Sequence, residues 1–242
     1  MASRTLADRH CSDLDRFYEM LARLEADVGK RRLADCSGWM AWPRRGVYFF
    51  FENGEFRRDG VTPRVVRVGT HAVAKGSKTT LWRRLSMHRG TRSGGGNHRG
   101  SIFRLHVGGA LLDRDDDLRP DPKSWGIDRS ANRAVRDAEA HVEQAVSSYI
   151  RAMPFLWVEA DDEPGKASIR RVIEANSVAL LSCTSPTGDT ADPPSETWPG
   201  RHCRNEAVRR SGLWNVQHTD SEYHPSLLAL LEECAGRTKP PR

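Results

Sequence analysis

Two neighbouring segments with strand character constrain this chain most. Residues 46–51 are a run of β-branched and aromatic residues, and residues 64–68 alternate Arg and Val before they end at Gly69. Asn53-Gly54 follows the first run and suits the positive φ angles of a type I′ turn, so we expect a hairpin there. A fold built on these segments must bury a short antiparallel sheet.

Helical patterns account for much of the remaining chain. Apolar residues recur every three or four positions in six segments, about 12–30, 77–88, 130–151, 165–182, 204–211 and 224–235. Further strands are expected at 101–107 and 155–158, and Trp39 and Trp42 are expected to dock on the core. The sequence predicts an α+β fold with a small, mostly antiparallel three-stranded sheet flanked by helices. Three parts are expected: an N-terminal helical extension (1–45), a central domain (46–183), and a loop with a C-terminal helical extension (184–242).

Composition excludes several classes of protein. No stretch approaches the ~18 apolar residues that a transmembrane helix needs, and charges in the first thirty residues leave no room for a signal peptide. The five cysteines are an odd number and form no C-x-x-C pair, which favours a reduced compartment over a disulfide framework. We therefore expect a cytoplasmic protein without membrane contacts.

The positive charge is concentrated in one segment. Residues 60–112 contain ten Lys and Arg but no Asp or Glu, whereas the rest of the chain has 28 Lys and Arg against 32 acids. A local field of this kind attracts polyanions. The residues expected to contact nucleic acid here are Lys75, Lys78, Arg89, Arg92, Asn97, Arg99 and Arg104.

Four short motifs follow one another in a fixed order. Gly46-Val47-Tyr48 begins the first strand pattern and Arg67-Val68-Gly69 ends the second. A helix then carries Arg84 and His88 one turn apart, and a later helix carries Glu174. In this order, over residues 46–182, they resemble the GIY-YIG endonuclease family, in particular its restriction-enzyme-like branch. Arg67 replaces the Tyr of the second motif, and 18 residues separate it from Tyr48, which is further than in the compact family core.

The resemblance implies a DNA endonuclease that depends on Mg²⁺ or Mn²⁺, with a role in restriction or phage defence. By the same resemblance, Tyr48 orients or activates water, Arg84 stabilises the phosphorane and Glu174 holds the metal. Arg67, His71 and His88 assist. The family's later polar residue has three candidates, Asn176, Asn205 and Asn215.

The chemistry of phosphodiester hydrolysis is consistent with these residue types. The reaction needs an activated water and cations on the developing charge. An Arg fork matches two phosphate oxygens, and a single carboxylate suffices for Mg²⁺, which keeps several waters. Glu174 is flanked on its helix by Val178 and Leu181, and a half-buried carboxylate needs a partner. Glu139 and Glu143 on the preceding helix are its rivals.

Other functions remain open at this stage. A non-catalytic nucleic-acid-binding protein on the same fold is favoured by Arg67 in the second motif, and an RNA nuclease is a further alternative. An HNH-type nuclease, drawing on His71, Asn97 and His98, fits less well because no ββα-metal spacing is present. Cleavage of both DNA strands suits a homodimer with two active sites.

Overall fold

The computed structural model describes residues 6–118, 122–165, 167–182 and 190–241. The predicted α+β class is confirmed, with a sheet of four antiparallel strands in the order β1-β4-β2-β3. The strands are β1 (Arg31–Arg32), β2 (Gly46–Phe56), β3 (Pro63–Gly69) and β4 (Pro154–Glu159). The two-residue β1 is the addition to the predicted three-stranded sheet.

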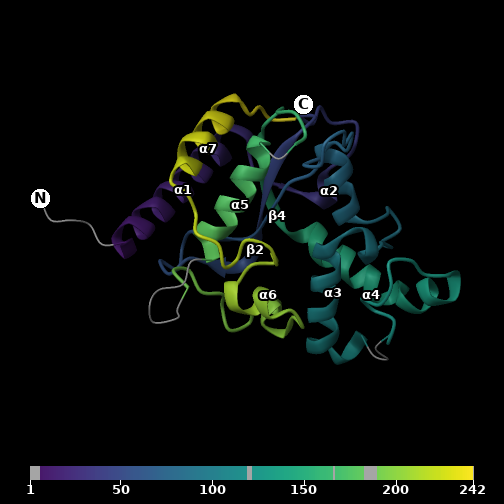
Figure 1. Ribbon diagram of the computed structural model, residues 1–242. Coiled ribbons are helices and arrows are strands. Elements are labelled where there is room, and N and C mark those ends of the chain that lie inside the picture. The colour runs from purple at the N-terminus through teal and green to yellow at the C-terminus, as the bar shows by residue number, and fades with distance from the viewer. Residues whose placement is uncertain (1–5, 119–121, 166, 183–189, 242) are drawn as a thin grey trace, which may run out of the picture.

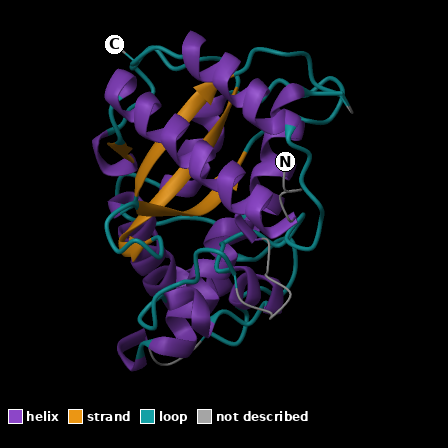
Figure 2. Cartoon of the chain, turned by 90° about the vertical axis from the view of Figure 1, so that its left-hand side faces the viewer, coloured by secondary structure: helices purple, strands orange, loops and turns teal. Residues whose placement is uncertain are grey.

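Helices cover the sheet in two groups (Figure 1). One group contains α1 (Leu6–Val28), α5 (Ile169–Ser182) and α7 (Ser226–Arg237), which pack against one another, and α1 and α7 also contact β4. The other contains α2 (Leu81–Arg89), α3 (Ile102–Arg114) and α4 (Arg133–Ala152), and α6 (Glu206–Ser211) is drawn to the left of α3. Figure 2 shows the strands enclosed between helices. None of the helices in the described residues is long and apolar enough to cross a membrane.

The central strand β2 explains how the two layers are joined. Its residues 46–51 are all buried, because β2 pairs with β3 on one side and with β4 on the other. Side chains alternate across a strand, so Phe49 packs edge-on against Phe17 of α1, while Phe50 contacts Phe103 of α3. Tyr48 shares the face of Phe50 and therefore points towards α2 and α3.

The expected turn at Asn53-Gly54 is wrong. Strand β2 continues through this dipeptide, where Gly54 has φ +86° inside a stretch of irregular register. The chain turns instead at residues 57–62, where the Arg57 carbonyl accepts a hydrogen bond from Gly60 N–H at 2.9 Å. The Asp59 carboxylate accepts hydrogen bonds from the N–H groups of Val61 and Thr62, which closes the turn. A glycine with positive φ therefore marks a β-bulge here.

The expected strand at 101–107 is also wrong, because these residues begin α3. The Ser101 hydroxyl caps the helix by accepting from Arg104 N–H at 3.3 Å. Within this segment, Phe103, Arg104 and Val107 are buried, at a helical rather than a strand spacing. The presence of a buried cation at position 104 disguised this pattern.

Two further expectations concern the flanking regions. Trp42 packs on the core as expected, stacked on Trp82, but Trp39 is 96% exposed. In the expected loop at 184–201, residues 184–189 lie outside the described residues. The division of the chain at 45 and 183 stays a prediction.

Candidate active site

The two strand motifs meet across β2 and β3. Tyr48 stands directly opposite Gly69 in the antiparallel register. A Cβ atom at Gly69 would lie 2.4 Å from the Tyr48 hydroxyl oxygen, and one at Gly46 would lie 2.4 Å from the Val158 carbonyl oxygen. Glycine is therefore required at both positions, because it allows the strands and the tyrosine ring to approach closely.

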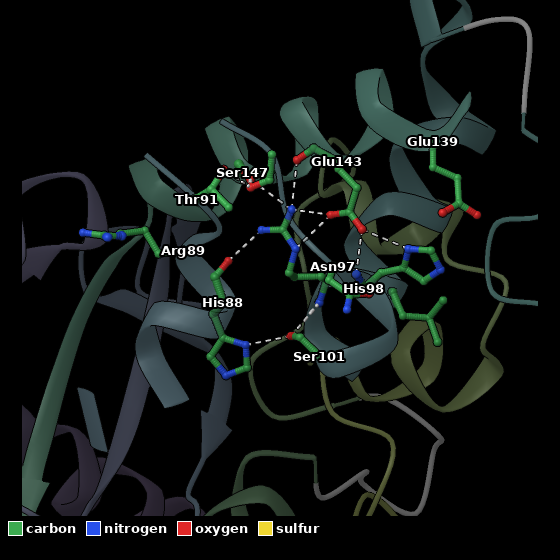
Figure 3. A network of polar contacts seen from close by, with 12 residues as sticks. His88, Arg89, Thr91, Asn97, His98, Ser101, Glu139, Glu143 and Ser147 are labelled. Atoms are coloured by element: carbon green, nitrogen blue, oxygen red, sulfur yellow. Dashed lines mark hydrogen bonds and ion pairs between the residues drawn. The ribbon is translucent and has the colours of Figure 1, made fainter. Parts of the chain in front are cut away.

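A chain of hydrogen bonds leads from Tyr48 to α3. The Tyr48 hydroxyl lies 2.8 Å from Nε2 of His88, and His88 Nδ1 lies 2.8 Å from the Ser101 hydroxyl; Figure 3 shows the second of these contacts. Burial lowers the pKa of His88 well below its usual value, and the nearby Arg84 and Arg67 lower it further. The imidazole is therefore neutral near pH 7, with one nitrogen that donates and one that accepts.

Arg67 lies at the place where the family pattern has a second tyrosine. The side chain is buried, its guanidinium donates to the Trp214 carbonyl, and its charge lies 4.6 Å from the ring centre of Phe103. Burial lowers the pKa of Arg67, while the proximity of Tyr48 and Glu174 opposes that effect. Arg67 thus brings a positive charge next to the Tyr48 hydroxyl.

Glu174 and Arg84 form the less buried part of the site. Glu174 on α5 is half-buried, and it accepts a hydrogen bond from the Thr70 backbone N–H. Burial raises the pKa of its carboxyl group, and the charges of Arg67 and Arg84 oppose that rise. Arg84 on α2 is half-buried as well, and the hydrogen bond that it donates to the Gly100 carbonyl is long at 3.4 Å.

His71 lies just beyond the second motif. It is only 5% exposed, and neither ring nitrogen makes a hydrogen bond of normal geometry among the described residues, although the Arg44 backbone lies beside the ring. Burial, followed by the charge of Arg170, lowers the pKa of His71 to about 4. The side chain is neutral at pH 7.

The candidate metal ligand is a single carboxylate. Among the described residues, no three His, Cys, Asp or Glu side chains gather in a group that could hold a metal ion. Glu174 nevertheless fits Mg²⁺ or Mn²⁺, because such ions keep several waters and accept few protein carboxylates. Its raised carboxyl pKa also indicates a buried negative charge that a cation would stabilise.

The rival carboxylates are engaged elsewhere, and Figure 3 shows the contacts of Glu143. Glu139 forms a two-pronged ion pair with Arg99, with N–O distances of 2.6 and 2.8 Å. Glu143 accepts from Arg104 Nε at 3.0 Å and from the His98 backbone N–H at 2.6 Å. Although burial alone would raise the pKa of both carboxyl groups, these bonds lower it. Both glutamates therefore fasten the 97–104 segment to α4.

The predicted DNA contacts divide into exposed and buried residues. Lys75, Lys78 and Arg92 are exposed, as is Asn97, whose side-chain oxygen accepts from Arg99 N–H. Arg89 is half-buried, and the Arg99 side chain is 7% exposed in its pair with Glu139. The predicted DNA contact of Arg104 is wrong, because its side chain is fully buried and paired with Glu143.

Of the three candidate asparagines, Asn215 lies next to the second motif. Its side-chain oxygen accepts from Val68 N–H at 3.1 Å, and its amide donates to the Val68 carbonyl at 2.8 Å. The preceding Trp214 N–H donates to the Val66 carbonyl at 2.7 Å. Asn176 bonds to the Val172 carbonyl, and Asn205 caps α6. Sequence reasoning missed Trp214, Thr70 and Ser101; only Ser101, a cap residue before a helix, left a recognisable signal.

This combination of groups defines the class of protein. A strand-held tyrosine, two arginines and one carboxylate next to a basic surface are the equipment of a phosphodiester-cleaving enzyme. The comparison with protein families then gives the particular family. A family model described as the GIY-YIG domain matches residues 8–241, so the chain belongs to the GIY-YIG family, and this supports nuclease activity. No curated protein and no solved structure matches the chain.

Proposed function

We propose that this protein is a DNA endonuclease that uses Mg²⁺ or Mn²⁺ to hydrolyse phosphodiester bonds. The observation that carries the proposal is the 2.8 Å contact between the Tyr48 hydroxyl and the neutral His88, with Arg67, Arg84 and Glu174 around it. A non-catalytic nucleic-acid-binding protein is the second candidate. It is favoured by the complete burial of Tyr48.

The tyrosine and histidine provide a route for a proton. With Nδ1–H of His88 donating to Ser101, the lone pair of Nε2 faces the Tyr48 hydroxyl. As water attacks phosphorus, its proton passes to the Tyr48 oxygen and the hydroxyl proton of Tyr48 passes to Nε2. The imidazole ends protonated, at a cost set by its burial, and the leaving oxygen takes a proton from solvent water. His88 then returns its proton through the Tyr48 hydroxyl to solvent, which restores the starting state.

The two arginines stabilise negative charge at two places, on the phosphate and on the Tyr48 oxygen. Arg84 presents a planar fork to two phosphate oxygens, and Arg67 supports the Tyr48 oxygen as it loses its proton. Glu174 would hold the divalent metal, which stabilises negative charge on the reacting phosphate when bound. Because Tyr48 is buried and Arg84 is weakly held, we expect the Arg84 side chain to move when DNA enters.

The substrate and biological setting complete the proposal. DNA binds the exposed cations Lys75, Lys78 and Arg92, a homodimer presents one site to each strand, and the protein acts in restriction or phage defence inside the cytoplasm. The defence role rests on the family resemblance. Plating of phage on cells that express the wild type or an inactive variant tests it, and equal plating contradicts it.

The central experiment compares the wild type with Glu174→Gln on plasmid DNA, with Mg²⁺ and with chelator. This change keeps the volume of the side chain but removes its negative charge. Cleavage should fall by about a hundredfold or more, while DNA affinity holds or rises because a negative charge leaves the site. Tyr48→Phe should give a similar loss, since only the hydroxyl departs.

Three outcomes would contradict the proposal. Binding without cleavage by the wild type in Mg²⁺ or Mn²⁺ favours the non-catalytic alternative. Faster cleavage of labelled RNA in parallel reactions favours the RNA nuclease. Normal cleavage by Glu174→Gln, together with loss of cleavage in Glu139→Gln, would mean that the metal ligand lies on α4 and not on α5.

A further inference from the structure

A second candidate site lies on the far side of α2. Trp82 and Arg89 are seven residues apart and share one helix face, whereas Arg84, two residues after Trp82, faces the opposite way. Trp82 and Arg89 line an open pocket of ≈ 530 Å³ together with Trp39, Arg92, Arg151 and residues 34–38. Arg89 and Arg92 are among the predicted DNA contacts, but none of the pocket residues belongs to the group around Tyr48, His88 and Glu174.

The pocket concentrates positive charge, because three arginines line it against one carboxylate, Asp35, which forms no ion pair with them among the described residues. Burial lowers the pKa of Arg89, and the charges of Arg151 and Arg92 lower it further, so the three guanidinium groups lie close enough to repel one another. Arg151 donates to the carbonyls of Arg89 and Thr91, and Arg89 donates to the Cys36 carbonyl at 2.7 Å. Within the described part of the chain, none of the three has a carboxylate at ion-pair distance, and the buried Nε of Arg89 lacks a partner.

The pocket also exposes an aromatic surface. Trp39 is 96% exposed, in contrast to Trp125, Trp157, Trp198 and Trp214, which are buried. The neighbouring Trp82 is half-buried, with Trp42 stacked on it at 5.5 Å and the Arg89 guanidinium 5.1 Å from its ring centre. An indole left in water beside three unpaired cations suits a ligand that is both flat and anionic.

We infer that this pocket binds one unpaired nucleotide of a DNA strand, with the base on Trp39 and the phosphate on Arg92 and Arg151. The volume lies in the range of small-ligand pockets, and bases stack on aromatic side chains whatever their identity. A base inside a duplex has no free face for Trp39, so the site selects single-stranded tails or extruded bases. This inference takes the DNA substrate from the proposed function but does not depend on cleavage.

Equilibrium binding tests the inference in chelator, where cleavage does not interfere. Fluorescence anisotropy compares a labelled blunt duplex with the same duplex carrying a five-nucleotide single-stranded tail. The wild type should prefer the tailed duplex. Trp39→Ala should weaken binding of the tailed duplex by roughly 5- to 150-fold, the equivalent of 1–3 kcal/mol per stacked base, and leave the blunt duplex unchanged. Trp39→Phe should retain part of the preference.

Matched controls separate stacking from charge and from protein contacts. Arg92→Ala should weaken binding of the tailed duplex more than Arg136→Ala, which removes an equally exposed cation about 22 Å along α4 from Arg151. Equal loss on both duplexes with Trp39→Ala, or no loss on either, overturns the inference. A change of oligomeric state in Trp39→Ala, seen by sedimentation, also overturns it, because Trp39 would then serve a protein interface. Glu174→Gln should keep the preference for the tailed duplex. A failure of the nuclease proposal would therefore appear in cleavage only, and a failure of this inference in binding only.

Discussion

The acid-free segment 60–112 supplies two sets of arginines that meet different neighbours. In the first set, each arginine has a buried carboxylate partner from another element, and its members are Arg64 with Glu55, Arg99 with Glu139, and Arg104 with Glu143. In the second set, no carboxylate lies at ion-pair distance among the described residues, and its members are Arg67, Arg83, Arg84, Arg89 and Arg92. A segment without acids in the sequence can therefore still be neutralised in the fold, because carboxylates of β2 and α4 pair with part of its arginines. Of these five unpaired arginines, Arg67 and Arg84 lie in the candidate active site, and Arg89 and Arg92 line the second pocket.

The largest expected effect is a difference in the free energy of unfolding between variants of Glu143, which pairs with Arg104, and of Glu174, the proposed metal ligand. Glu143→Gln leaves the fully buried Arg104 without its counter-charge, and loss of one partner of a buried pair costs about 3–5 kcal/mol. Glu174→Gln should leave the free energy of unfolding unchanged or raise it, because burial already disfavours the Glu174 charge. Urea unfolding of the two variants measures both values. A similar loss of stability in both variants would mean that Glu174, like Glu143, has a structural role.

The next effect tests the close approach of the two strand motifs. Gly69→Ala places a methyl group against the Tyr48 hydroxyl and ring, so the tyrosine must shift. A displacement of about 1 Å in a catalytic group can cost roughly a hundredfold in rate, and we expect a loss of that order in plasmid cleavage. Gly109→Ala is the control, since a Cβ there meets nothing within 4 Å. A folded Gly69→Ala variant with normal activity would show that Tyr48 need not be held in place.

A smaller effect concerns the pH dependence of stability that arises from two buried histidines. Burial, followed by Arg67, lowers the pKa of His106 to about 4, as burial and Arg170 do for His71. The unfolded chain, with histidine pKa values near ~6.5, therefore binds more protons between about pH 4 and 6.5. Stability should rise with pH across this window, by up to about 1.4 kcal/mol per pH unit for each group. Urea unfolding at pH 4.5, 5.5, 6.5 and 7.5 measures the slope, which His106→Asn should reduce. An unchanged slope in that variant would contradict this account.

The smallest effect compares one member of each arginine set on DNA. Arg92→Ala should weaken binding about equally on all sequences and lower the salt slope by up to ~0.9, the value for one lost phosphate contact. Arg99→Ala should leave the slope unchanged, because Glu139 already neutralises Arg99. Binding of a duplex over a range of salt concentrations measures both slopes. A larger slope change in Arg99→Ala would mean that Arg99 leaves Glu139 and contacts a phosphate when DNA binds.

The sequence predicted the elements whose signals are local. The apolar run of β2, the Arg- and Val-rich strand β3 and the six periodic helices are all present. These features follow from side-chain period, which needs no knowledge of distant residues. The family assignment rested on them and is confirmed.

Features that depend on partners far along the chain could not be predicted. Arg104 interrupts an apolar pattern, and only the approach of Glu143 from α4 makes its burial possible. Asn53-Gly54 has the composition of a turn, but the competing Asp59-Gly60 closes the loop. Asn215 and Trp214 reach β3 from almost 150 residues away, so nothing near them in sequence marks their role. The assignment of Glu174 as metal ligand stays a prediction.

The bonds from Trp214 and Asn215 to β3 also bear on how the chain is made. Strand β3 is the last in the sheet order, and its outer backbone groups would form a template for aggregation if they were left open. The residues that cover them are translated on the order of ten seconds after β3 itself. During this interval the nascent chain carries an open sheet edge next to the basic segment 60–112. Safe synthesis of this protein therefore depends on what shields that edge at the ribosome, and truncation before residue 214 should produce an insoluble product.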